Sequence, residues 1–324
     1  MRTGKELILA TKPFAKEIPW KSWFHTISTL LVLIACFFGT VYIPNIFLRL
    51  ACSIFTGMVM VRLFVIYHDH QHHSILNRSF PADIIFTLYG IFILAPNSIW
   101  KRSHDYHHAH NSKLISANIG SWPIFTKEKF MSVSKREQFN YLFIRHPLTI
   151  FFGYFIVFFY GMTMQSFLSS PRRHKDSLIA MILHVSAIIA VFIFFGWKAW
   201  LFCIFIPFLV ACAIGSYLFY AQHNFPGVTF KDNIEWSYDN AALESSSYMV
   251  MNPFWRWVTA NIGYHHIHHI NARIPFYRLP EVMKCIPEMQ QAKTTTLNPS
   301  DIIACFRLKV WDPERKRMIG ISQL

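Results

Sequence analysis

The chain has 324 residues, of which 53% are hydrophobic and only 15% are charged. This composition, with its positive mean hydropathy, favours an integral membrane protein over one or two soluble domains. The formal net charge is +14, which suits attraction to anionic lipid headgroups or to an acidic partner protein. No nucleic-acid-binding signature accompanies this charge, so no nucleic-acid partner is expected.

Four runs with few or no charged residues predict four full membrane spans. Each is close to the ~20 residues that a helix needs to cross a bilayer. Arginines in the second run lie near enough to its ends to extend their charged groups to the interface. The predicted spans are residues 26–43 and 46–67, which form one hairpin (26–67), and 178–197 and 199–222, which form another (178–222), with 1–25 as a cytoplasmic N-terminal segment.

Two further apolar stretches, 84–99 and 148–167, are harder to place. A single site made by the histidine clusters described below requires an even number of crossings between consecutive clusters. The stretch 84–99 must therefore lie in the interface or enter and return. Basic residues flank 148–167 on both sides, at Arg145 and Arg172 among others, and positive charge marks the cytoplasmic side. This stretch is therefore predicted to be a partial insertion.

The elements together predict one all-α integral membrane domain over residues 1–324. It has four transmembrane helices, two short partial or interfacial insertions, and a cytoplasmic, histidine-rich helical cap assembled from 68–147 and 223–324. Basic residues near both ends place both termini in the cytoplasm. The run 26–43 is as long as a span and lacks a small-residue cleavage site, so it is expected to be retained.

Three histidine clusters stand beside the apolar runs, and a single histidine lies between the last two. On a helix, residues at i, i+3 and i+4 share one face, so each cluster points several imidazoles in one direction. Neutral imidazole suits iron, zinc, copper and nickel, and more than six imidazoles indicate two ions, without separating iron from copper or zinc. The clusters are His68-Asp69-His70-Gln71-His72-His73, His104-Asp105-Tyr106-His107-His108 and His265-His266-Ile267-His268-His269, and the single residue is His223.

Ligating histidines need their second nitrogen held by a carboxylate, carbonyl or water. Asp69 and Asp105 each follow a cluster histidine and are candidates for that role, with an exposed acidic residue as the equally weighted alternative. Four histidines that are isolated in sequence are interpreted as structural, and the six cysteines, which show no CxxC spacing, as packing residues. The isolated histidines are His25, His146, His174 and His184.

These clusters give the chain a resemblance to the membrane fatty acid desaturases, and to their bacterial acyl-lipid branch above all. The family has three boxes of the form HxxxH, HxxHH and HxxHH. Here they correspond to 68–72, to 104–108 after Trp100-Lys101-Arg102, and to 265–269 after Asn261-Ile262-Gly263-Tyr264. The segments Gln222-His223-Asn224-Phe225 and Ala242-Leu243-Glu244-Ser245-Ser246-Ser247-Tyr248 also resemble this branch, and the similarity covers roughly residues 25–285.

The resemblance implies a site with two non-haem iron ions, O2 as oxidant, and removal of two hydrogens from adjacent methylenes of a fatty acyl chain, with a lipid-linked acyl group preferred. It also implies a multi-pass protein of a bacterial inner membrane. One departure from the family is Phe219, which stands where some desaturases have an asparagine that contacts one iron through water. The implied metal ligands are His68, His72, His104, His107, His108, His223, His265, His268 and His269, whereas His70, His73, His110 and His266 fall outside the matched positions.

The implied reaction consumes two electrons that the substrate does not provide. The sequence has no GxGxxG, no cysteine-rich cluster motif and no fused haem-binding pattern. The electrons must therefore come from a separate protein such as ferredoxin or cytochrome b5, and a basic cytoplasmic surface fits docking of an acidic donor. A narrow apolar tunnel from the bilayer is expected to position the acyl chain.

Two alternative functions stay open at the level of sequence. A related membrane hydroxylase acting on an alkane, sterol or carotenoid would carry similar boxes, and its product would gain an oxygen instead of losing two hydrogens. A metal transporter would need ionisable groups at mid-membrane, whereas nearly all histidines here flank the spans. The position of the double bond, the chain length and the carrier of the acyl group cannot be read from the sequence.

Overall fold

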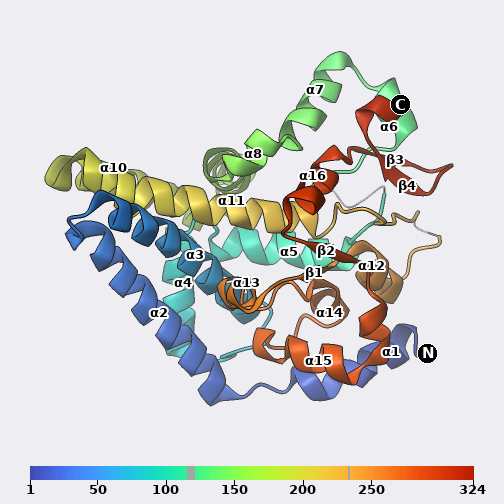
Figure 1. Ribbon diagram of the computed structural model, residues 1–324, viewed down its shortest axis with the longest axis horizontal. Helices are drawn as coiled ribbons and strands as arrows, with labels where there is room; N and C mark the ends of the chain where they lie inside the picture. The colour runs from blue at the N-terminus through green and yellow to red at the C-terminus, as the bar shows by residue number, and fades with distance from the viewer. Residues whose placement is uncertain (115–120, 233) are drawn as a thin grey trace.

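The computed structural model describes residues 1–114, 121–232 and 234–324, and helices dominate this part of the chain (Figure 1). The first half contains α1 (Gly4–Thr11), η1 (Lys12–Ala15), α2 (Pro19–Tyr42), α3 (Ile46–Gln71), α4 (Phe80–Phe92), α5 (Asn97–His110), α6 (Lys127–Ser132), α7 (Lys135–Ile144), α8 (Pro147–Phe151), η2 (Tyr154–Met164) and α9 (Gln165–Ser169). The second half contains α10 (Lys175–Trp200), η3 (Leu201–Phe205), α11 (Ile206–Ala221), α12 (Tyr238–Ser245), β1 (Tyr248–Val250), α13 (Pro253–Val258), α14 (His265–Ile270), η4 (Phe276–Arg278), α15 (Leu279–Cys285), η5 (Pro287–Gln291), β2 (Thr294–Thr296), α16 (Pro299–Arg307), β3 (Val310–Asp312), β4 (Arg317–Ile319) and η6 (Ile321–Gln323).

Three helical segments of the described chain are long and apolar enough to cross a membrane: Pro19–Tyr42, Ile46–Gln71 and Lys175–Ala221. The third is folded back on itself. Gly196 has φ 80°, outside the helical region, and the rings of His184 and Phe208 lie 4.7 Å apart across the fold. A straight helix would hold those two residues tens of ångströms apart, at about 1.5 Å of rise per residue.

Helices cover the four apolar runs that were predicted as spans, although some of the ends differ. α2 begins at Pro19, before the expected start at residue 26, because proline suits the first turn of a helix. α3 continues to Gln71, past the expected end at residue 67, and thereby carries His68 on its last turns. The reversal between the two later spans was expected near residue 198 and lies at Gly196.

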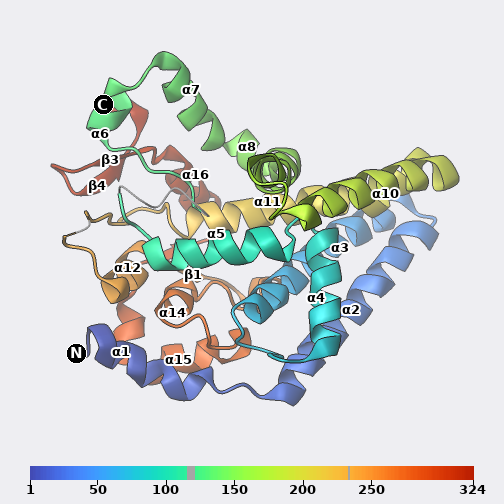
Figure 2. The same ribbon diagram turned by 180° about the vertical axis from the view of Figure 1, so that it is seen from behind.

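The two stretches predicted as partial insertions are both irregular. α4 and α5 are bent by 89° at the break between them, which fits either a broken span or a segment that enters and returns. The stretch 148–167 contains the wider π-helical turns of η2. Figures 1 and 2 both draw η2 nearly end-on, whereas α10 and α11 run across the view, so its axis is strongly inclined to theirs.

The expectation of an all-α fold is correct for the bulk of the chain but misses two small sheets. β1 and β2 pair in parallel, and β3 and β4 form an antiparallel pair. Both sheets belong to the C-terminal region, which also receives the N-terminus: the Arg2 guanidinium binds the Glu288 carboxylate at 2.8 Å, and the Gly4 N–H donates to Asp239 at 2.7 Å. Figure 2 shows α1 beside α12 and α15.

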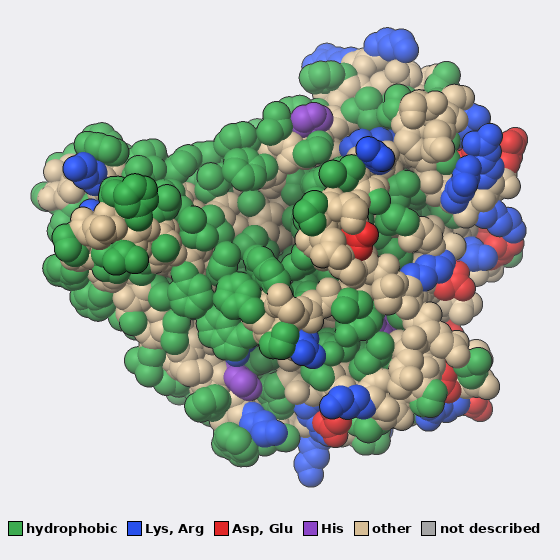
Figure 3. Space-filling view, viewed as in Figure 1, with side chains coloured by type: hydrophobic (Ala, Val, Ile, Leu, Met, Phe, Trp, Pro, Cys, Tyr) green, Lys and Arg blue, Asp and Glu red, His purple; other side chains and the backbone are tan. Residues whose placement is uncertain are grey.

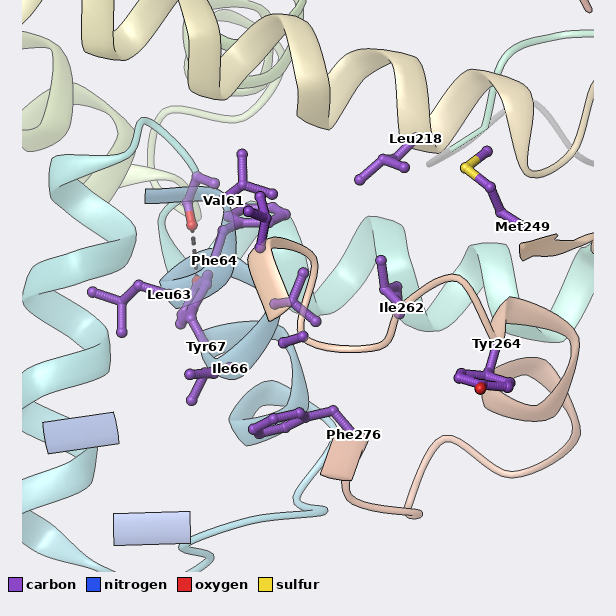
Figure 4. Packing of buried hydrophobic residues seen from close by; sticks show 14 of the residues in the cluster. Val61, Leu63, Phe64, Ile66, Tyr67, Leu218, Met249, Ile262, Tyr264 and Phe276 are labelled. Atoms are coloured by element: carbon purple, nitrogen blue, oxygen red, sulfur yellow. Dashed lines mark hydrogen bonds between the residues drawn. The ribbon is translucent and has the colours of Figure 1, made fainter. Parts of the chain in front are cut away.

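The largest core cluster surrounds the C-terminal half of α3. Figure 4 shows Val61 and Phe64 of this helix on the side of Leu218 of α11 and Ile262 of the segment before α14, whereas the Tyr67 hydroxyl donates to the Ala95 carbonyl. The outer surface is divided: hydrophobic side chains cover the end that holds α10, and Lys and Arg gather at the opposite side (Figure 3). At the reversal, Phe194 and Phe195 are 77% and 71% exposed. Such a large exposed apolar surface fits a bilayer.

Candidate metal centre

Four separate segments bring the candidate ligands together. α3 supplies His68 and ends at His72, and α5 supplies the second cluster. His223 follows the end of α11, and the six-residue α14 is made almost wholly of the third cluster. Gly263 lets the chain approach closely before α14, because a Cβ there would lie 2.5 Å from the Met249 carbonyl oxygen.

The nine histidines form two groups, and within each group the nitrogen atoms that could bind an ion lie within 4.8 Å of one another. Of the nine, only His72 and His223 are half-buried, and the other seven are buried. The first group is His68, His72, His104, His108 and His268, and the second is His107, His223, His265 and His269.

Each HxxHH box is divided between the groups. His104 and His108, at i and i+4, belong to the first group, and His107 belongs to the second. In α14 the arrangement is reversed, because His265 and His269 join the second group and His268 the first. Side chains at i+3 and i+4 point about 100° apart around a helix, so adjacent residues of one box can face two neighbouring centres.

Six Nε2–Nε2 separations between neighbouring ligands have the length expected around one ion. In the first group His104 lies 2.8 Å from His68 and 3.1 Å from His108, which is 3.0 Å from His268. In the second group, His223 lies 3.0 Å from His107 and 2.9 Å from His265, which is 3.1 Å from His269. Two nitrogens bound at about 2.1 Å and at a right angle are about 3.0 Å apart, whereas a tetrahedron would separate them by about 3.4 Å.

The buried nitrogen atoms also fit a metal better than they fit each other. Among the described residues, the Nε2 atom of His72 is buried without a hydrogen-bond partner. Neutral imidazole has one N–H donor, so three neighbouring Nε2 atoms such as those of His68, His104 and His108 cannot all be matched by hydrogen bonds. A cation between them would satisfy every lone pair.

The environment keeps these imidazoles neutral. Burial lowers the pKa of His223 from its ordinary value to about 4. Burial, and then the neighbouring imidazoles, hold the pKa of His268 and His269 well below the usual range. Metal binding requires the deprotonated imidazole, so the site presents free lone pairs at neutral pH.

Second nitrogens of several ligands are held by nearby groups. His223 Nδ1 donates to the Ser245 carbonyl at 3.0 Å, and His107 Nδ1 lies 2.5 Å from the Ser121 hydroxyl. These two partners were not predicted from sequence. Ser245 lies in segment 242–248, which resembles the family, so a role near the site could have been expected. Ser121 lies outside all of the matched segments, so nothing in the sequence indicated its contact with His107.

The two predicted acidic partners have different surroundings. Asp69 is buried, its carboxylate lies 3.4 Å from His68 Nδ1, and it accepts a 2.6 Å hydrogen bond from the Phe276 N–H. Asp69 therefore links α3 to the chain that follows α14. Asp105, by contrast, is exposed.

The histidines predicted to lie outside the ligand set are outside both groups. His70 lies 3.2 Å from Asp83, His73 is exposed, His110 Nδ1 is 3.0 Å from the Tyr106 carbonyl, and His266 Nε2 is 3.1 Å from the Met289 carbonyl. The isolated histidines contact Arg62 (His25), the Leu148 N–H (His146), Ser98 (His174) and Tyr154 (His184).

Several cavities lie against α11, and one of the larger two reaches the first group. One of 440 Å³ is lined by His104, Trp100, Val157 and Phe219 among others, and a second, of 530 Å³, has Leu218 in its wall. A small cavity between them is lined by His68, His104, His265, Leu218 and Phe219. Phe219 thus forms an apolar wall beside His104, with 6.2 Å between the rings.

Comparison with known proteins agrees with this geometry. The model of the family described as fatty acid desaturase matches residues 44–298, which include both histidine groups. A protein of Bacillus subtilis (strain 168) named fatty acid desaturase is 28% identical over 99% of this chain and 91% of its own length. The sn-1 oleoyl-lipid 12-desaturase of Synechocystis is 25% identical over 80% of this chain and 74% of its own. The chain therefore belongs to the fatty acid desaturase family and is an oxidoreductase of lipid metabolism.

Proposed function

We propose that the chain introduces a double bond into a lipid-linked fatty acyl chain at a site with two iron ions. The observation that carries this proposal is the division of nine histidines into groups of five and four, with Nε2 separations near those of right-angled coordination. That spacing argues against two tetrahedral zinc sites. Bound iron would supply the activation of O2 that breaking an unactivated C–H bond requires.

The reaction must balance in atoms and electrons. Two hydrogens leave adjacent methylenes, one O2 is reduced, and two protons and two electrons enter, so that a double bond and two water molecules result. The two extra electrons come from an external donor such as ferredoxin or cytochrome b5. The protein's own task is to hold one pair of methylenes beside the ligand histidines and to exclude the rest.

We assign the acyl chain to the 440 Å³ cavity beside His104. Its volume lies within the range of ~300–1,000 Å³ that is usual for small-molecule sites. Its wall is mostly apolar and includes Ile156, Val157 and Met162 of η2, which also carries the exposed apolar side chains of Phe155 and Tyr160. A lipid can therefore present its chain from the side, with Trp100 and Phe219 placing it against the first histidine group.

We further propose four crossings, with each arm of the Gly196 hairpin crossing once. The histidine groups, the cap and both termini then lie on the cytoplasmic side of a bacterial inner membrane. Support comes from the apolar exposed end around Phe194 and from the basic surface at the opposite side of the molecule. The distribution agrees with the tendency of cytoplasmic segments to carry Lys and Arg.

Expression in a host with simple fatty acids, followed by mass spectrometry of its lipids, tests the proposed reaction. Desaturation lowers the acyl mass by two hydrogens and creates a double bond whose position can be located. A gain of one oxygen would instead assign the chain to the membrane hydroxylases. His268→Ala, which removes a ligand of the first group, should abolish the new product.

A further inference from the structure

One helix outside the histidine groups has an apolar side that nothing in the described chain covers. On α7, Phe139 and Phe143 are 66% and 45% exposed. They are four residues apart, so they share one face, and their rings stack with 6.2 Å between centroids. Soluble surfaces seldom expose two neighbouring phenylalanines in this way.

The opposite side of α7 is firmly packed. Tyr141 is 3% exposed and forms a small core with Phe130 of α6, Val310 of β3 and Ile319 of β4. The Tyr141 hydroxyl donates to the Lys309 carbonyl at 2.5 Å. The contacts with α6, β3 and β4 therefore fix the orientation of the helix, and the outward side with Phe139 cannot turn inward.

Exposed apolar side chains continue along the chain after α7. Directly after α7, Leu148 and Phe151 of α8 are 59% and 51% exposed, and Phe155 of η2 is 45% exposed. Figure 1 shows α7 extending from the end of α8, next to η2. The exposed phenylalanines of α7 therefore add to a series of exposed apolar side chains that runs from α7 through α8 to η2.

Two cations stand where this helix begins. Lys135 and Arg136 occupy its first turn and are exposed. Basic residues are unfavourable at a helix N-terminus, where the macrodipole is positive, and here only Glu137, in a capping box with Ser134, offsets them. Their side chains lie within about 60° of Phe139 around the helix, so charge and apolar surface share one face.

The other end of α7 is tied to the metal centre. Arg145 is completely buried, and its guanidinium donates to the Asn224 side chain at 2.8 Å, next to His223. Its carbonyl accepts a 2.7 Å hydrogen bond from Lys309. Ile144 and Thr149, on either side of Arg145, line the 440 Å³ cavity.

We propose that α7 lies on the membrane surface as an interfacial arm. Phe139 and Phe143 enter the acyl boundary, and Lys135 and Arg136 bind the phosphates of anionic lipids, the arrangement typical of interfacial amphipathic helices. The arm holds one wall of the cavity mouth at the depth of the lipid headgroups.

Spin labelling in lipid bilayers tests the arm directly. The parent is a Cys285→Ser variant, which removes the one exposed cysteine among the described residues, in nanodiscs that contain anionic phosphatidylglycerol. Phe139→Cys and Glu314→Cys are then labelled with a nitroxide; Glu314 is an exposed residue in the turn between β3 and β4, the strands that pack against the buried side of α7. Collision with O2, which concentrates in lipid, is compared with collision with a water-soluble nickel chelate.

The proposal expects the label at position 139 to collide mainly with O2 and the label at 314 mainly with the nickel chelate. Equal access of the chelate to both positions would overturn it. So would a label at 139 that is exposed to water in the bilayer and becomes protected only when an acidic donor protein is added. Iron content and thermal unfolding of each variant show that the label reports on a folded chain.

The cations are tested in the same system. Lys135→Gln combined with Arg136→Gln should move the label at position 139 toward water in anionic nanodiscs and leave its depth unchanged in nanodiscs of neutral phosphatidylcholine. An equal depth in both bilayers, with and without the two substitutions, would exclude phosphate binding by this pair. Lys198→Gln, in the last turn of α10, serves as a control for the loss of an exposed lysine elsewhere on the molecule.

Discussion

His72 and His73 are consecutive residues with opposite surroundings. The His72 ring lies 4.6 to 4.9 Å from the rings of His68, His104, His108 and His268, whereas the His73 side chain is exposed. The helix ends here: the His72 N–H still donates to the His68 carbonyl of α3, and His73 has φ 57°. One peptide unit thus separates a ligand position from the surface.

This pair allows a matched test of the metal centre. His72→Ala should lower the iron content from two ions to about one per chain and abolish desaturation, because it removes a ligand whose neighbours cannot replace it. His73→Asn should keep both, since asparagine tolerates a positive φ. Elemental analysis of the purified proteins measures the iron. Similar iron contents in the two variants would contradict the assignment of His72.

The cavity beside His104 predicts which side chains limit the acyl chain. Val157→Trp would fill part of this 440 Å³ space, and the specificity constant for a long-chain acyl lipid should fall about tenfold or more. Phe155→Trp, two residues away at a 45% exposed position, should act like the unchanged enzyme. Steady-state kinetics with iron content as a control measures both, and an unimpaired Val157→Trp enzyme would place the acyl chain elsewhere.

Close packing of α3 on α11 predicts a stability difference between two glycines. A Cβ at Gly57 would lie 2.7 Å from the Pro207 carbonyl oxygen, which is backbone and cannot move aside. Gly57→Ala should therefore destabilise the fold by about 1–3 kcal/mol through overpacking. At Gly215 the nearest atom would be 3.4 Å away, so Gly215→Ala should have little effect. Thermal unfolding in detergent compares them, and equal losses would refute the argument.

Lys309 predicts a pH dependence of stability. Burial, and then the nearby Arg145, lower the pKa of Lys309 from 10.5 to about 8. Between these values the unfolded chain binds the proton and the folded chain does not, so the contribution of Lys309 to stability rises with pH from about 8 to 10.5. The melting temperature of the wild type should therefore rise relative to that of Lys309→Met as the pH increases over that range. A constant difference from pH 7.5 to 10 would show that Lys309 does not titrate there.

Electrostatic docking of an acidic electron donor predicts a dependence on salt. Arg315 and Lys316 are exposed on the turn between β3 and β4, and such charges act mainly on the association rate. Turnover with a limiting amount of reduced ferredoxin should fall as ionic strength rises, and Arg315→Glu with Lys316→Glu should raise the KM for ferredoxin. Lys198→Glu should leave it unchanged. Turnover that is indifferent to salt would exclude this mode of docking.

The membrane helices could be predicted from sequence because the length and charge of an apolar run largely determine them. The strands could not. β3 and β4 are three residues each, and Trp311 is placed by its N–H bond to the Phe125 carbonyl, nearly two hundred residues earlier in the chain. The sequence around Trp311 does not indicate which distant residue it will contact. The wider turns of η2 were not predicted either.

The sequence predicts which histidines belong to the candidate site, but it does not predict how they are divided between the two groups. Helical spacing shows that His104, His107 and His108 point in related directions, but it does not show that His107 faces a different centre from its neighbours. That division depends on where α14 and His223 stand relative to α5. The Asp69 contact with the Phe276 N–H likewise joins segments that only the folded chain brings together.

Because the candidate ligands come from four segments, they are synthesised at different times. When the first half of the chain has left the ribosome, four of the five members of the first group are present but only His107 of the second. The second group gains its remaining three members only after residue 269 has been synthesised. In the proposed two-iron site, loading would therefore be completed late in biogenesis, and a chain truncated before α14 should leave the membrane machinery without a stably bound pair of ions.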